Sequence, residues 1–478
     1  MLLMLAGCAR LVLCLLVALG IPCATWAETR ELTLRFATQR NVQSLICPSV
    51  PGGTVRKPAA RGGPPSDARL PDAADLSALP TPASMPQDAV PAHYLERFKL
   101  PPRAASAPLR IGLWGDSHLA AGFVGDALTQ ALRAKGYTVG SRWVSLAMGR
   151  AGVRTPLRRV CVSPRWSFEP AYQARDEKLR VGPDLARLHT HQRDSYLWLD
   201  LRDADGMARI RAVDIFYQPG ARGAGLLVGV DDARARPVRL SPARSGEPPG
   251  RLRVQVAGAL SLLKLRVMAG ELTLYGIRLQ AADVPDVELD LMAYPSATIR
   301  GWAVADAETL HAMLGDDGFD GVVLAYGTNE GNVAPFAPAA YESTLVAGLN
   351  GLRKAIPTAS CLLAGPTDRG RLLSARTQGV SQEARSRELL HYARIHQAIA
   401  DAQARAGVTA HCGLWRWQAF MGGQGSIYRW LLETPPLAAP DLTHLTLEGY
   451  RRSGVALAEV LGWNASAPAA PPFEPHPP

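Results

Sequence analysis

Short apolar runs that lead into polar turns constrain the fold of this chain more than any other feature. Residues 321–326 read Gly-Val-Val-Leu-Ala-Tyr, the uninterrupted apolar run of a strand buried on both faces. Similar runs alternate with segments whose apolar residues recur at helical spacing. We predict strands at 109–114, 321–326, 361–364 and 408–412, and helices at 119–134, 341–355, 381–406 and 447–461. The alternation predicts an α/β domain, with a parallel sheet covered by helices on both faces.

The middle of the chain has a different pattern. Its apolar runs are short and partly alternating, and Gly and Pro turns separate them. We predict strands at 210–217, 226–230, 252–256 and 272–277. Short strands with frequent turn residues are typical of a β-sandwich. We therefore expect a β-sandwich inserted into the α/β domain.

The N-terminus has the features of an export signal. Residues 11–21 form an uncharged apolar run after Arg10, which has the length of a signal-peptide core and is short for a membrane span. We expect a signal peptide over residues 1–27 with cleavage after Ala27, and hence a periplasmic or secreted protein. A segment that stays attached as a membrane anchor is the alternative.

Proline marks the segments that we expect outside the folded body. Twelve prolines lie between residues 48 and 102, and six more lie in 464–478. Such composition favours extended, poorly ordered chain. The predicted division is a signal peptide (1–27), an N-terminal extension and Pro-rich linker (28–106), the first α/β part (107–150), the inserted β-sandwich (151–288), the second α/β part (289–463) and a disordered tail (464–478).

Charge and cysteine content narrow the function classes. The formal net charge is +10, but the excess is scattered arginine without a basic run, which favours the anionic cell envelope over nucleic acid as a partner. Beyond the predicted signal, Cys47, Cys161, Cys361 and Cys412 remain, and the sequence leaves their three possible pairings open. No His/Cys cluster has zinc-site spacing, so we expect no metal.

A Gly-Asp-Ser-His motif at residues 115–118 directly follows the first predicted strand. Ser117 would therefore lie at the carboxyl end of a parallel strand, where open α/β sheets place their sites. The N–H groups of the following helix would point at the same position and could stabilise an oxyanion. Taken alone, the motif favours an ordinary helix start in which the serine caps the helix.

Two further motifs supply the groups that an acyl-transfer serine needs. Asn329 follows the buried run at 321–326 and can donate its side-chain N–H to an oxyanion without titrating. Asp441 and His444 lie three residues apart, so one loop can carry both a base for Ser117 and the carboxylate that orients it. Each motif alone fits an ordinary turn or cap, but their joint occurrence favours a serine hydrolase.

At these residues the chain resembles the SGNH (GDSL-like) hydrolase family. The resemblance implies a flavodoxin-like three-layer fold, with Ser117 as nucleophile, Asp441 and His444 as its partners, and Asn329 in the oxyanion hole beside the Ser117 N–H. Gly115, Asp116 and Gly327 are the supporting motif residues.

The family's second block resembles residues 294–299, Tyr-Pro-Ser-Ala-Thr-Ile. The oxyanion glycine of that block then falls on Ser296, a departure from the family pattern. Serine can still donate its backbone N–H if the local φ and ψ tolerate a Cβ. A rival alignment uses Gly149 or Gly152.

Within the family, the chain is most similar to bacterial peptidoglycan O-acetylesterases. His118 follows the serine, residues 326–330 read Tyr-Gly-Thr-Asn-Glu, and a carbohydrate-binding-like β domain separates the first two blocks. The resemblance implies an exported esterase that acts on an O-acetylated envelope polysaccharide, most of all peptidoglycan, without a cofactor. Cys361 and Cys412 would lie in neighbouring strands, so their disulfide is the first choice of pairing, which leaves Cys47 with Cys161.

Three other functions fit parts of the same sequence. An O-acetyltransferase would use the same acyl-enzyme with a sugar hydroxyl as acceptor, and sequence does not separate it from an esterase. A lipase or thioesterase would need an apolar lid segment, which the sequence does not offer. A non-catalytic glycan-binding envelope protein would be expected to have lost one of Ser117, Asp441 and His444, and all three are present.

Overall fold

The computed structural model describes residues 31–37, 44–48, 69–80, 89–103, 105–175, 178–203, 205–244, 246–315, 318–374 and 379–463. The predicted signal peptide and tail lie outside these residues, as do residues 49–68 and 81–88 of the predicted linker. Among the described residues, none of the helices combines the length and apolar composition needed to cross a bilayer.

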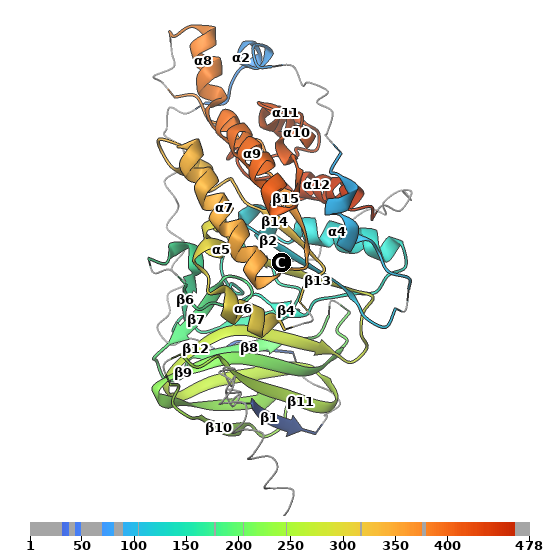
Figure 1. The fold of residues 1–478 in the computed structure, drawn as a ribbon, viewed down its shortest axis with the longest axis vertical. Coiled ribbons are helices and arrows are strands. Elements are labelled where there is room, and N and C mark those ends of the chain that lie inside the picture. Colours follow the sequence, from blue (N-terminus) through green and yellow to red (C-terminus); the bar gives the residue numbers. More distant parts are fainter. Residues whose placement is uncertain are drawn as a thin grey trace, which may run out of the picture.

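A six-stranded parallel sheet forms the centre of the α/β part (Figure 1). Its strands are β2 (Leu109–Gly115), β3 (Val139–Gly140), β13 (Val287–Ala293), β14 (Gly321–Ala325), β15 (Ser360–Ala364) and β16 (Cys412–Trp415). Their spatial order is β16-β15-β14-β2-β13-β3, and every neighbouring pair is parallel. The five longer strands thus have the doubly wound order 2-1-3-4-5, whose switch point lies between β2 and β14.

Helices cover both faces of this sheet, as the alternation of elements predicts. Figure 1 shows α7 and α9 on one side and α4 and α12 on the other. Val322 and Leu324 of β14 belong to the hydrophobic cluster beneath α7 and α9, whereas Val323 and Ala325 belong to the cluster beneath α4 and α12. The covering helices are α4 (Phe123–Ala134), α5 (Arg300–Val304), α6 (Ala307–Leu314), α7 (Pro338–Ala355), α9 (His391–Ala410) and α12 (Leu447–Val460), while α8 (Gln382–Leu389) lies beyond the sheet, next to α9 (Figure 1).

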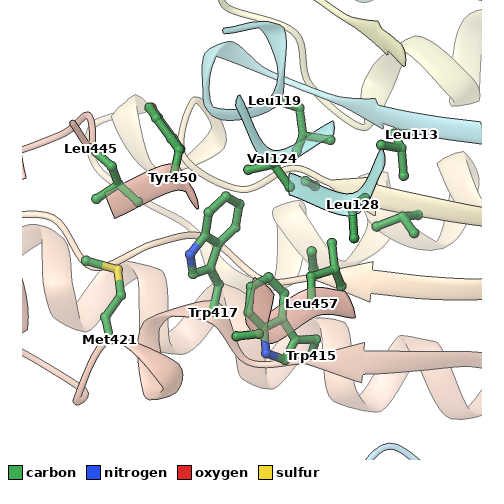
Figure 2. Close-up of a cluster of buried hydrophobic side chains, with 14 of the residues drawn as sticks. Leu113, Leu119, Val124, Leu128, Trp415, Trp417, Met421, Leu445, Tyr450 and Leu457 are labelled. Carbon is green, nitrogen blue, oxygen red and sulfur yellow. The ribbon is translucent and has the colours of Figure 1, made fainter. Parts of the chain in front are cut away.

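Large aromatic side chains fill the core on the α12 side. Figure 2 shows Trp417 of α10 (Trp417–Phe420) between Trp415 and Tyr450. The rings of Trp415 and Trp417 stack with centroids 5.3 Å apart. On the same side, α12 approaches α4 so closely that a Cβ on Gly454 would lie 2.6 Å from the Ala127 Cβ. Leu442 and Leu445 of the loop before α12 are buried in the same cluster, so this core holds that loop.

A second sheet of ten strands is antiparallel except for one pairing. Its long strands β9 (Ile210–Val230) and β12 (Leu262–Ala281) pair along most of their length. Both halves of β9 contribute to one hydrophobic cluster, so the sheet bends over its own core. The other strands are β1 (Glu31–Phe36), β4 (Trp143–Val144), β5 (Arg159–Val162), β6 (Ser167–Pro170), β7 (Ala186–Thr190), β8 (Tyr196–Asp200), β10 (Arg236–Leu240) and β11 (Gly250–Leu260).

The middle of the chain differs from prediction in two respects. The predicted strands 210–217 and 226–230 are one continuous strand, because the Gly and Pro residues between them form a bend with irregular register instead of a chain reversal. The predicted boundaries 151–288 also shift at both ends. β4 already pairs with β12 before residue 151, and β13 joins the parallel sheet from Val287.

Part of the predicted linker is built into the fold, contrary to expectation. β1 pairs in parallel with β11, and residues 69–100 contain α2 (Ala73–Ser77), η1 (Ala92–Tyr94) and η2 (Glu96–Phe98). Phe98 is fully buried, and its carbonyl oxygen accepts a bond from the Trp463 indole at 2.8 Å. Apolar residues between the prolines therefore attach this segment to the body.

Both cysteine pairs form disulfides. Cys361 and Cys412 join the neighbouring strands β15 and β16, and Cys47 joins Cys161 of β5. The second bond links two positions that are 114 residues apart in the sequence.

Three predicted elements have different limits. The helix predicted at 119–134 is two helices, because Gly122 adopts φ +80° between α3 (Ser117–Ala120) and α4. The helix predicted at 381–406 is divided at Leu390 into α8 and α9. The predicted strand 408–412 is wrong: α9 continues to Ala410, and the chain turns at His411, where φ is +53°.

Candidate active site

The candidate nucleophile lies where β2 leads into a helix. The Asp116 carboxylate caps α3 by accepting a hydrogen bond from the His118 N–H at 3.0 Å. Ser117 is the first residue of that helix, where a backbone N–H has no partner within the helix. Gly115 permits close packing, since a Cβ there would lie 2.7 Å from the Ala325 carbonyl oxygen of β14. The turn thus holds the Ser117 hydroxyl beside the switch point of the sheet.

Ser117, His444 and Asp441 form a chain of hydrogen-bond contacts. Ser117 Oγ is 3.0 Å from His444 Nε2, and His444 Nδ1 is 2.7 Å from Asp441 Oδ2. Asp441 Oδ1 also accepts bonds from the backbone N–H groups of Thr443, at 3.0 Å, and of His444, at 2.9 Å. A carboxylate facing Nδ1 favours the tautomer in which Nδ1 carries the proton, so Nε2 is free to accept one from Ser117.

The contact between His444 and Asp441 shifts both pKa values in the direction that general-base catalysis requires. The hydrogen bond that His444 Nδ1 donates to Asp441 raises the pKa of His444 above its ordinary value, although burial opposes the shift. Burial alone would raise the pKa of Asp441, but the bonds from the His444 ring and from two backbone N–H groups outweigh it and hold the pKa well below its usual range. Asp441 is therefore ionised and can stabilise an imidazolium. The side chains of His444 and Asp441 are 42% and 52% exposed, so substrate can reach them.

A second histidine lies behind the first. His118 is buried, and its ring centroid is 5.4 Å from that of His444. Its Nδ1 lies 3.1 Å from the Tyr450 hydroxyl, and its Nε2 lies 3.3 Å from Thr367 Oγ1. Burial lowers the pKa of His118 well below its ordinary value, so the ring is neutral. Both ring nitrogens of His118 thus have hydrogen-bond partners, and the His118 ring packs behind the His444 ring.

Asn329 lies at the end of β14, beside the loop that follows β13. Its Nδ2 donates to the Ala297 carbonyl oxygen at 3.0 Å, which leaves the second N–H of the amide for another acceptor. Gly327 adopts φ +135°, and a Cβ there would lie 3.0 Å from Ile399 and Pro366. The glycine therefore allows the chain to turn tightly just before Asn329.

Ser296 lies in the same loop as Ala297, directly after β13. Its φ is +69°, the left-handed region that glycine adopts without cost. The rival positions Gly149 and Gly152 also have positive φ values, of +76° and +79°, and Gly152 lies close to the same loop, since a Cβ there would be 3.3 Å from Pro295. All three positions thus have the left-handed conformation, and Ser296 is the one that directly follows a strand of the parallel sheet.

The structure brings together residues from three adjacent strand ends and the loop before α12. Ser117 follows β2, Ser296 follows β13 and Asn329 follows β14, while Asp441 and His444 precede α12. Sequence reasoning gave no site role to Glu330 or Tyr450, although both stand within or just after the quoted motifs. Their contacts depend on other loops, so the local sequence carries no signal for them.

No group of three or more His, Cys, Asp or Glu side chains within the described ranges is placed to hold a metal ion. The arrangement of serine, imidazole and carboxylate matches the one that general-base activation of a hydroxyl requires.

No family model matches this sequence, and no curated protein matches it. Among solved structures, a peptidoglycan O-acetylesterase matches with a TM-score of 0.57 at 22% identity, covering 77% of this chain and 95% of that one. A family two carbohydrate esterase from Cellvibrio japonicus matches with a TM-score of 0.23 at 10% identity, covering 64% and 98%. A salicylyl-acyltransferase from a tetracycline biosynthetic pathway matches with a TM-score of 0.24 at 14% identity, covering 65% and 99%. The chain has the α/β fold of the peptidoglycan O-acetylesterase, in agreement with the resemblance of its motifs to SGNH hydrolases.

Proposed function

We propose that this chain is an exported serine esterase that removes O-acetyl groups from a cell-envelope polysaccharide, namely peptidoglycan. The observation that carries the proposal is the line of contacts from Ser117 Oγ through the His444 ring to the Asp441 carboxylate. The fold shared with a peptidoglycan O-acetylesterase supports the choice of substrate. The predicted signal peptide, together with two disulfides, supports an oxidising compartment outside the cytoplasm.

In the first half-reaction, Ser117 Oγ attacks the acetyl carbonyl carbon while His444 Nε2 takes the hydroxyl proton. The negative charge that develops on the carbonyl oxygen would be held by the backbone N–H groups of Ser117 and Ser296 and by the Asn329 side chain. His444 then gives its proton to the departing sugar oxygen, the ester C–O bond breaks, and an acetyl-Ser117 remains.

In the second half-reaction, His444 removes a proton from water, and the resulting hydroxide attacks the acetyl-enzyme. Acetate leaves, and Ser117 recovers its proton from His444. Asp441 stays ionised throughout and stabilises the imidazolium formed in each half. The cycle consumes one water and releases one acetate, and it needs no cofactor.

We extend the proposal to the antiparallel sheet, which we expect to act as an inserted, carbohydrate-binding-like β-sandwich domain. A groove of about 390 Å³ on this sheet is lined by side chains of β6, β7, β9 and β12. Glu169 pairs with Arg187 at 2.7 Å, and the Tyr275 hydroxyl donates to Gln218 Oε1 at 2.7 Å. These groups offer fixed donors and acceptors of the kind that sugar hydroxyls can use. The net charge of +10 would favour an anionic polymer.

The test is acetate release from O-acetylated peptidoglycan by purified residues 28–478, with a small aryl acetate as a parallel substrate. Ser117→Ala should abolish release from both substrates. Ser343→Ala removes an exposed hydroxyl on α7 and should leave both rates unchanged. Release from both substrates that depends on Ser117 would establish the esterase and its wall substrate.

Two other outcomes of this experiment would contradict part or all of the proposed function. Turnover of the aryl acetate alone would keep the serine mechanism but reject peptidoglycan as the acetyl donor, and acetyl transfer to acceptor sugars would then be measured. No Ser117-dependent turnover of either substrate would contradict the esterase and favour a glycan-binding role, which sedimentation with purified cell walls would detect.

A further inference from the structure

Ser296 has a backbone conformation that its side chain disfavours. Its φ of +69° lies in the left-handed region, which a residue with a Cβ adopts less readily than glycine. Ser296 is exposed, so burial of its side chain does not enforce this conformation. The restraint must therefore come from the backbone on either side.

Glu330 and Asn329 supply such a restraint from the neighbouring loop. One carboxylate oxygen of Glu330 accepts from the Ile299 N–H at 2.9 Å, and the other accepts from the Gly327 N–H at 3.0 Å. Asn329 Nδ2 donates to the Ala297 carbonyl oxygen at 3.0 Å. The segment after Ser296 is thus held at two points, first by an amide and then by a carboxylate. The same carboxylate also holds the turn that precedes Asn329.

The Glu330 carboxylate is buried and accepts hydrogen bonds from backbone N–H groups. Burial raises its pKa to about 7, while the bonds from backbone N–H groups oppose the shift, so Glu330 is fully ionised and accepts from both N–H groups only above this pH. A desolvated carboxylate forms stronger bonds to N–H donors than a solvated one, because water does not compete for its oxygens. Its two oxygens accept from backbone N–H groups of two different loops, so the carboxylate is held from both sides.

We propose that Glu330 is a positioning residue that ties the Ser296 loop to the Asn329 loop, so that the two oxyanion donors converge on one point. This inference rests on the proposed function, because it assigns Glu330 to the oxyanion hole of the same esterase. Glu330 touches no reacting atom; it acts through the backbone of Ile299 and Gly327. A serine in place of the family's glycine makes this restraint necessary.

Glu330→Gln is the direct test. An amide accepts from only one of the two N–H groups, and its NH₂ meets the other as donor against donor. Complete loss of one oxyanion donor costs about 10²–10³ in kcat, so a displaced donor should cost about tenfold or more with an unchanged KM. Glu342→Gln, which removes only an exposed pair with Arg405, is the matched control and should retain wild-type kcat.

The second variant separates positioning from general support of the fold. Ser296→Gly in the Glu330→Gln background should restore at least severalfold of the lost kcat, because glycine adopts the left-handed conformation without the restraint. An isolated loss of stability would not be repaired at this one position. Wild-type kcat in Glu330→Gln, or no recovery in the double variant, would overturn the inference.

A measurement without turnover keeps the inference apart from the proposed function. Urea unfolding of the four proteins in the Glu330→Gln and Ser296→Gly cycle measures their coupling directly. Ser296→Gly should raise the urea midpoint more in the Glu330→Gln background than in the wild type. If the wild type shows no Ser117-dependent turnover, the proposed function fails, and additive midpoints in this cycle would separately overturn the role of Glu330.

Discussion

Asp441 accepts three hydrogen bonds, and only one of them orients the base. Oδ1 accepts from the backbone N–H groups of Thr443 and His444, whereas Oδ2 accepts from His444 Nδ1 at 2.7 Å. In Asp441→Asn, the amide oxygen can keep the two backbone bonds, which places the NH₂ against Nδ1. Two donors cannot face each other, so the imidazole changes tautomer and Nε2 carries the proton. Nε2 then cannot accept the proton of Ser117.

The expected loss is large because the same change removes a charge. Without the carboxylate, the imidazolium formed during attack by Ser117 has no counter-charge. A wrong tautomer in a Ser-His-Asp arrangement lowers kcat by about 10⁴, equivalent to about 5 kcal/mol of transition-state stabilisation. The folded state should change little, since the backbone bonds to Oδ1 persist.

The assay is steady-state hydrolysis of an aryl acetate at pH 8, with thermal unfolding measured by circular dichroism. Asp401→Asn is the matched control, because it removes a carboxylate that pairs with Arg416 on the surface of α9. Its kcat should equal that of the wild type. A kcat of Asp441→Asn within tenfold of the wild type would refute the reasoning, because His444 would then be oriented by some other group.

Two further predictions concern the base and the helix pair beneath it. Since Asp441 raises the pKa of His444 above 6.5 and only the neutral ring accepts a proton, kcat/KM should fall as the pH falls through a value above 6.5. A pH profile whose acid limb is centred below 6.5 would contradict this. Gly454→Ala should lower the free energy of unfolding by about 1–3 kcal/mol, because the added methyl meets Ala127 and the backbone of α4. Gly125→Ala, which meets nothing within 4 Å, should raise it by about 0.5–1 kcal/mol in the same urea titration, and equal effects would show that the helix contact is not close-packed.

The strand ends of the parallel sheet could be predicted because their signals are local. The run at 321–326 can be buried only inside a covered sheet, and it places Asn329 at a carboxyl end. The position of Ser117 at the carboxyl end of β2 could be predicted in the same way. Asp441 and His444 needed only the three-residue spacing that one loop provides.

Other features depended on long-range contacts. The predicted helix 381–406 ends before Gly407, whereas α9 continues through Gly407, where a Cβ would stand 2.7 Å from the Cys412 carbonyl oxygen. This glycine is required by the turn into β16, which no local pattern indicates. Ser296 departs from the pattern of the family, and its conformation depends on Glu330 in a separate loop. The position of the His118 ring depends on Tyr450 and Thr367, which contact it from segments that are distant in the sequence.

The Cys47–Cys161 disulfide has a topological consequence for the site. It closes residues 47–161 into a covalent ring that contains Ser117, while Asp441 and His444 lie outside this ring. A single backbone cut between residues 48 and 69 would open the ring without dividing the molecule, because Cys161 would still hold the N-terminal piece. That piece would also remain paired through β1 to β11. The cut protein would run as one species without reductant and as two with it, and the nucleophile would stay with its base in both cases.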